Sequence, residues 1–138
     1  MAVINGSGVP YGSVMLKSGL QATVDLTVSG DDTASALGSG EVTVLGTPRV
    51  VALCEQAALL ALSPELRPGQ TTVGARFELA HLVPVAVGSK IRATATLERA
   101  EGRRLVFNVA VTDACGLVAA GKVTRVVVDK DDFLRRAR

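Results

Sequence analysis

The chain has 138 residues, of which 48% are hydrophobic and 20% are charged. This length fits a single domain, and the apolar content is sufficient for a packed interior and rules out general disorder. The 15 Lys and Arg residues against 13 Asp and Glu leave a formal charge of +2, and only 3% of the residues are aromatic. This composition argues against a basic nucleic-acid-binding module, which needs a larger positive excess and stacking rings.

The N-terminal part of the chain contains one predicted strand. Residues 1–18 are rich in Gly, Ser and Val without steady periodicity, which predicts a flexible arm. Small and polar residues over 30–40 predict a loop, and residues 41–45 a short extended piece. Between the arm and the loop, apolar and polar residues alternate, so we expect a half-buried strand whose inner face carries Leu20, Ala22, Val24, Leu26 and Val28.

A helix is predicted over about residues 48–62. Thr47 is suited to cap its free amide groups, and Pro48 suits the first turn because it has no amide hydrogen to satisfy. The helix should end at Ser63-Pro64, since the residue before a proline avoids helical geometry. Almost no polar face is visible in this segment, so we expect other structure to wrap it on all sides.

Four strand candidates follow, over residues 70–81, 89–100, 104–113 and 117–129. Tight reversals at Glu101-Gly102 and Cys115-Gly116 predict an antiparallel meander, and parallel crossovers are excluded because no helix intervenes. One strand, one buried helix and four antiparallel strands predict an α+β hot-dog fold, in which a curved sheet wraps the helix.

This fold organises the chain as one domain over residues 19–133, followed by a charged and solvated tail over 134–138. A single sheet of this kind leaves an open edge, so we expect a second copy to cover it in a homodimer. The chain has no run of 18 apolar residues and no signal-like start, which predicts a cytoplasmic protein with reduced thiols.

Glu55 is the most informative polar residue, because it lies in the middle of the apolar helix. A carboxylate in apolar surroundings costs free energy unless it is paired, hydrogen-bonded or protonated. Carboxyl groups in such places have raised pKa values, and these values suit proton transfer near neutral pH. Groups of this kind therefore cluster in active sites. The alternative is that Glu55 and Gln56 form a narrow wet stripe.

His81 and Thr47 are the next candidates. His81 is the only histidine, and in a strand without a bulge it shares the helix-facing side with Val73, Ala75, Phe77 and Leu79. The alternative is a structural or exposed histidine. Thr47 is either only a helix cap or a hydroxyl at the positive end of a helix, where developing negative charge is stabilised.

Several other residues have weaker indications. Gly74 interrupts a strand, which indicates a bulge or tight packing, or a bare amide open to a substrate carbonyl. Arg125 shares a face with Val123 and Val127 and needs a buried partner or a phosphate. Cys54 is expected to be a buried, inert thiol, and no role is predicted for Cys115. Arg103, Arg104 and Lys122 are solvated surface residues or contacts for an acidic nucleotide.

The spacing of these residues resembles that of one known family. Thr47 precedes Glu55 by eight positions, His81 follows Glu55 by 26, and a Glu-Gly-Arg-Arg-Leu hairpin starts at Glu101. With the residues around them, these features resemble the fluoroacetyl-CoA thioesterase-like family of hot-dog proteins over about residues 20–133.

The resemblance implies that Thr47, Glu55 and His81 together hydrolyse an acyl-CoA thioester, near the interface of a homodimer. It further implies that Gly74 and Arg125 bind substrate. No metal or redox cofactor is expected, because a thioester is already activated, and two cysteines with one histidine cannot form a four-ligand zinc site alone.

One departure from the family and two alternatives stay open. The fluoroacetate-specific enzyme has phenylalanines before the helix that form a lid, whereas residues 30–46 here contain no aromatic residue, so we predict a different or broader acyl group. The alternatives are a non-catalytic module that binds CoA esters or another small ligand, and a hydratase or dehydratase that acts on the acyl chain. The resemblance implies that Thr47 or Glu55 attacks the thioester carbonyl or orients a water that attacks it, and both residues stay candidates for the nucleophile.

Overall fold

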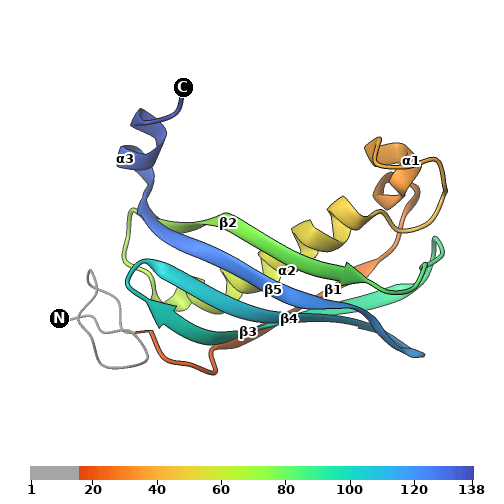
Figure 1. Cartoon of the computed structure of the whole chain (residues 1–138), viewed down its shortest axis with the longest axis horizontal. Helices are drawn as coiled ribbons and strands as arrows, with labels where there is room; N and C mark the ends of the chain where they lie inside the picture. The colour runs from red at the N-terminus through yellow and green to blue at the C-terminus, as the bar shows by residue number, and fades with distance from the viewer. Residues whose placement is uncertain (1–15) are drawn as a thin grey trace.

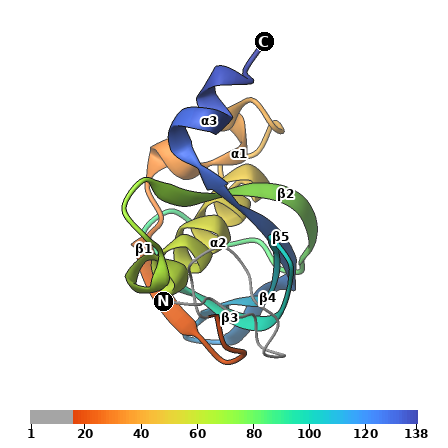
Figure 2. The same cartoon turned by 90° about the vertical axis from the view of Figure 1, so that its left-hand side faces the viewer.

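Five antiparallel strands curve around one long helix in the computed structural model, which describes residues 16–138 (Figures 1 and 2). The sheet order is β1-β3-β4-β5-β2, which confirms the predicted meander and the α+β class. The strands are β1 (Gln21–Thr27), β2 (Gln70–His81), β3 (Lys90–Glu101), β4 (Arg104–Asp113) and β5 (Gly116–Asp129). The helices are α1 (Ala34–Leu37), α2 (Thr47–Leu62) and α3 (Lys130–Arg135), with 3-10 turns η1 (Gly30–Asp32) and η2 (Ser63–Glu65).

The first strand has the predicted alternation. Every second residue of β1 is half-buried, namely Ala22, Val24 and Leu26, and the strand pairs with β3 from Gln21↔Thr96 onwards. Most of the predicted arm, residues 1–15, lies outside the described residues, but Leu16 is fully buried in the core.

Helix α2 is not wrapped on all sides by its own chain, which differs from the prediction. Leu53, Cys54, Ala57 and Ala58 are buried against the sheet. The opposite face carries exposed residues, with Leu59 37% and Leu60 51% exposed, besides Ala52 and Gln56. Exposed leucine side chains on the central helix favour a further element that covers this face.

Strand β2 forms a free edge of the sheet and is irregular. The register with β5 shifts between Gly74 and Arg76, so Ala75 lies in a bulge that moves the inner face from even to odd positions along the strand. The prediction that Val73 shares the face of His81 is therefore wrong, because Gly74 and Thr72 occupy that face before the bulge. Residues 74–78 are all exposed.

Two segments have more structure than was predicted. The expected loop contains η1 and α1, the bridge Thr33↔Leu45 joins the residues on either side of α1, and the bridge Val44↔Ala86 joins this segment to the chain before β3. The charged C-terminal residues form the exposed helix α3, which Asp129 caps by accepting a hydrogen bond from the amide of Asp132. Within residues 16–138, none of the helices is both long enough and apolar enough to span a lipid bilayer.

Candidate active site

Thr47 and His81 form a direct contact between the start of α2 and the end of β2. The Thr47 hydroxyl oxygen lies 2.8 Å from Nδ1 of His81. The prediction that Thr47 caps the helix is wrong, because Gly46 occupies the cap position and Thr47 is the first helical residue. Its side chain is free to hold the imidazole, since a residue at the first helical position does not cap the following amides.

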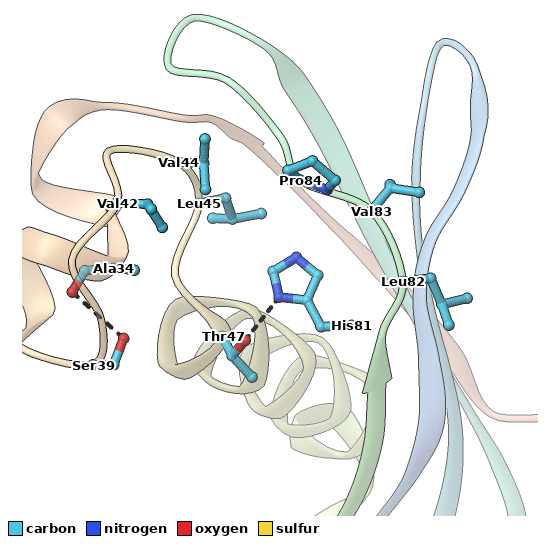
Figure 3. Close-up of a pocket in the computed structure, with 10 residues that line it drawn as sticks. All are labelled: Ala34, Ser39, Val42, Val44, Leu45, Thr47, His81, Leu82, Val83 and Pro84. Carbon is cyan, nitrogen blue, oxygen red and sulfur yellow. Dashed lines mark hydrogen bonds between the residues drawn. The ribbon is translucent and has the colours of Figure 1, made fainter.

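A pocket of about 310 Å³ opens above this pair (Figure 3). Thr47 and His81 form its floor, and the segments around Val42–Leu45 and 82–84 form its sides. Nε2 of His81 points into the pocket, is buried, and has no hydrogen-bond partner among the described residues. A buried ring nitrogen without a partner is a place for a bound water or a substrate atom, because an unsatisfied polar group is costly.

Glu55 is paired with a buried arginine. Nη1 of Arg125 donates to the Glu55 carboxylate at 2.7 Å, and the same guanidinium donates to Oγ1 and the carbonyl oxygen of Thr72 at 2.8 and 2.7 Å. The Arg125 side chain is 6% exposed and that of Glu55 is 33% exposed. The predicted need of Arg125 for a buried partner is thereby met within the protein, and the charge of Glu55 is compensated while one side of its carboxylate stays accessible.

Gly74 leaves the space that the Glu55 carboxylate occupies. A methyl group at Gly74 would lie 2.5 Å from Oε2 of Glu55 and 2.6 Å from Cζ of Phe77, distances that force a neighbour to move. Gly74 also lies opposite Arg125 in the β2–β5 register. Gly74 on β2 and Arg125 on β5 therefore both position the carboxylate of Glu55.

The structure brings the five predicted residues together in two groups rather than one. Thr47 lies with His81, whereas Glu55 lies with Gly74 and Arg125. Thr47 and Glu55 are eight residues apart on α2, which separates them by about 12 Å along the helix axis. Along β2, about 20 Å separates Gly74 from His81. Glu55 does not line the pocket of Thr47 and His81, so one chain alone does not join the three predicted catalytic groups.

A third group of residues, absent from the predictions, ties the pocket wall to α2. The Asp32 carboxylate accepts hydrogen bonds from the amide and hydroxyl of Ser29 at 2.8 and 3.0 Å and from Nε of Arg49 at 2.9 Å. Burial alone would raise the pKa of Asp32, but the hydrogen bonds from Ser29 and Arg49 hold it below its ordinary value. The spacing Ser29-x-x-Asp32 is typical of a capping box and is the feature from which this group is predictable.

The remaining candidates lie away from both groups. Cys54 is buried, and desolvation followed by the nearby Glu55 charge raises its pKa to about 11, which makes it a poor nucleophile at neutral pH. Lys122 pairs with Glu98 on the outer side of the sheet, and Arg103 donates to the carbonyl oxygen of Val127. In the described part of the chain, no three His, Cys, Asp or Glu side chains cluster as metal ligands do.

Known proteins share both the sequence pattern and the architecture. Residues 28–131 match the family described as fluoroacetyl-CoA-specific thioesterase. The chain belongs to this family. A fluoroacetyl-CoA thioesterase from Streptantibioticus cattleyicolor is 30% identical over 95 residues, which cover 69% of this chain and 68% of that protein.

Solved structures agree with this family membership. The fluoroacetyl-CoA thioesterase FlK superposes with a TM-score of 0.84 at 26% identity, over 88% of this chain and 95% of that one. A hot-dog-like protein from Thermanaerovibrio acidaminovorans gives a TM-score of 0.79 at 30% identity, over 86% and 88% of the two chains. The predicted family and the hot-dog fold are both confirmed.

Proposed function

We propose that two copies of this chain form an acyl-CoA thioesterase in which Thr47 and His81 of one copy act with Glu55 of the other. Membership of a thioesterase family makes the chain a thioester hydrolase. The observation that supports a shared site is the separation of Glu55 from the Thr47–His81 pair within one chain. The free edge of β2, which the sheet leaves unpaired, is the surface available to a second copy.

The side chains of β2 favour one antiparallel pairing of two copies. Residues directly opposite each other in an antiparallel pair point to the same face of the sheet. The two-fold axis must therefore lie where one residue of β2 faces the same residue of the second copy. An axis at Arg76 or at Glu78 would set like charges against each other, whereas an axis at Phe77 sets Arg76 of each copy opposite Glu78 of the second copy. Phe77 pairs with buried Val123 and is nevertheless 42% exposed, so it provides apolar surface at that axis.

This pairing would complete the site. With the axis at Phe77 and the bulge at Ala75, His81 of one copy lies opposite the stretch from Thr72 to Gly74 of the second copy. That stretch is the one against which Glu55 and Arg125 are held. The Glu55 carboxylate of the second copy would then face the pocket above Thr47 and His81.

The groups so assembled fit hydrolysis of a thioester. The oxygen of water, or of Thr47 or Glu55 in a covalent route, adds to the thioester carbonyl carbon. Breakage of the carbon–sulfur bond then releases the CoA thiolate, which takes up a proton. In a covalent route, a water then hydrolyses the acyl–enzyme bond, which releases the acid and restores the Thr47 or Glu55 side chain. His81 is suited to carry these protons, because one ring nitrogen is hydrogen-bonded to Thr47 and the other is directed into the pocket. The start of α2 and the Gly74 amide are candidates to stabilise the oxyanion, and Arg125 acts on the substrate through Glu55.

The acyl group is proposed to differ from fluoroacetyl. Residues 30–46 contain no aromatic residue, so the aromatic lid expected of a fluoroacetyl-selective member is missing. We also propose a cytoplasmic location, because both cysteines are free and Cys54 is buried.

Release of free CoA from a panel of acyl-CoA esters, followed with a thiol reagent, tests the activity. Glu55→Gln and His81→Ala should each abolish release while leaving the protein folded and dimeric. Binding of esters without release by the unaltered protein would favour a non-catalytic binding module. Products that retain the thioester would favour a hydratase, a reaction in which the Thr47 hydroxyl has no evident task.

A further inference from the structure

Most of the residues that line the pocket above Thr47 and His81 have apolar side chains. Ten of the described residues line it, and the polar ones among these are Ser39, Thr47 and His81. The apolar ones are Ala34, Val42, Val44, Leu45, Leu82, Val83 and Pro84. Among residues 16–138, none of the Asp, Glu, Lys or Arg side chains lines this pocket, and Figure 3 shows Val44, Leu45, Val83 and Pro84 on the side of the imidazole away from Thr47.

We infer that this pocket binds the acyl chain of the substrate, and that it selects uncharged, apolar acyl groups longer than acetyl. This inference rests on the proposed thioesterase function and adds the substrate class. Nε2 of His81 supplies the polar end of the pocket, since it is buried without a partner and suited to hydrogen-bond the reacting water or the thioester. The acyl chain then extends from the imidazole toward Val42, Val44 and Pro84.

The exposure of the rim explains the preference for longer chains. Val42, Leu82 and Val83 are 57%, 54% and 40% exposed. A two-carbon acyl group leaves a pocket of about 310 Å³ largely unfilled, whereas a longer chain removes these side chains from water. Each added methylene that is buried is expected to raise kcat/KM about fourfold until the pocket is full.

The same lining explains the rejection of charge. A terminal carboxylate on the acyl chain would enter a space that no Lys or Arg among the described residues of one chain lines, and that the Glu55 carboxylate of the second copy faces in the proposed dimer. Burying an unpaired charge costs far more than burying a methylene gains. Succinyl-CoA, which has the four-carbon chain of butyryl-CoA with a carboxylate at its end, is therefore expected to be cleaved at least about 30-fold more slowly than butyryl-CoA.

Val42 provides a direct test of the size limit. It lines the pocket from the segment that lacks aromatic residues, and it is exposed enough to accept a larger side chain. Val42→Phe should lower kcat/KM for hexanoyl-CoA about tenfold relative to acetyl-CoA, because the ring occupies the chain's space. Val87→Phe is the matched control, since Val87 is 50% exposed and lies outside the pocket, and it should leave that ratio within about twofold.

The experiment measures kcat/KM of the unaltered protein and of both variants for acetyl-, butyryl-, hexanoyl- and succinyl-CoA. Binding of the same esters is measured by calorimetry on Glu55→Gln, with and without Val42→Phe. Equal rates for butyryl- and succinyl-CoA, or an equal loss on every ester in Val42→Phe, would overturn the acyl-pocket inference. Hydrolysis of none of the esters would instead overturn the proposed function. In that case the chain-length dependence of binding still decides whether the pocket receives acyl groups.

Discussion

The Thr47 hydroxyl oxygen and Nδ1 of His81 lie 2.8 Å apart, and this hydrogen bond joins the first residue of α2 to the last residue of β2. It fixes the plane of the imidazole and leaves Nε2 directed into the pocket. Because Gly46, and not Thr47, is the helix cap, the hydroxyl can be removed without loss of a capping interaction.

Thr47→Ala is therefore expected to lower kcat/KM about 100-fold or more with little loss of stability, because the imidazole loses its hydrogen bond to Thr47. Thr47→Ser keeps the hydroxyl and should retain most of the activity. Steady-state kinetics together with thermal unfolding separates the two effects. A variant Thr47→Ala that loses stability and activity in parallel would show that the hydroxyl is structural.

The position of Gly74 leads to a prediction for a single added methyl group. Gly74→Ala would put a methyl group 2.5 Å from Oε2 of Glu55, so the carboxylate must move. A shift of about 1 Å in a reacting group costs about 100-fold in rate, and we expect a loss of that order in kcat. Gly30→Ala is the control, because a methyl group there meets nothing within 4 Å. Unchanged kcat in Gly74→Ala would mean that the location of the Glu55 carboxylate is unimportant.

The charges on the free edge of β2 predict how two copies associate. Arg76 and Glu78 are exposed and pair with each other at 2.6 Å within the chain, and in the proposed dimer each faces its opposite on the second copy. Arg76→Glu should raise the dimer dissociation constant about tenfold, because like charges then meet on both sides of the axis. Adding Glu78→Arg should restore the dimer.

Sedimentation velocity over a range of concentrations measures this change. Arg104→Glu reverses an exposed charge on β4, away from the edge, and should not affect association. If Arg76→Glu leaves the dimer intact, or if the double variant fails to recover, β2 is not the contact surface.

Asp32 is expected to make the free energy of unfolding depend on pH, with lower stability in acid. Its pKa is lowered in the folded protein, so its stabilising contribution is complete above the unfolded value near 3.9 and is lost as the pH falls through the folded value. Asp32→Asn should cost about 1–3 kcal/mol at pH 7, since the hydrogen bonds to the charged group are weakened. The difference between the two proteins should shrink below about pH 4. Urea unfolding at pH 7 and pH 3.5 measures it, and a constant difference would contradict the role of the carboxylate charge.

The hot-dog fold was predictable because its elements have strong local patterns. The alternation from Leu20 to Val28 marks β1, and the turns at Gly102 and Gly116 make β3, β4 and β5 consecutive neighbours. The bulge at Ala75 was not predictable, because it depends on the register with β5, and it transferred the inner face from Val73 to Gly74. The Thr47 cap was mispredicted because Gly46 and Thr47 both suit a helix start, and the contact with His81 decides between them.

The candidate site was predictable residue by residue but not in its arrangement. Spacing along the chain selected Thr47, Glu55 and His81 as candidates, yet it carries no information on how the fold separates Glu55 from the other two. The pair Glu55–Arg125 depends on contacts 70 residues apart in sequence. The Asp32–Arg49 pair likewise depends on how residues 29–46 fold back onto α2.

The shared site is tested most directly by mixing two inactive variants, Glu55→Gln and His81→Ala, after dissociation and reassociation. In the mixed dimer, one site combines intact Thr47 and His81 from the first variant with intact Glu55 from the second. About half of the dimers are mixed and each has one intact site, so we expect recovery of about a quarter of the unaltered activity. If Glu55 acts on the His81 of its own chain, every site in the mixture carries a defect, and activity will stay at the level of the separate variants.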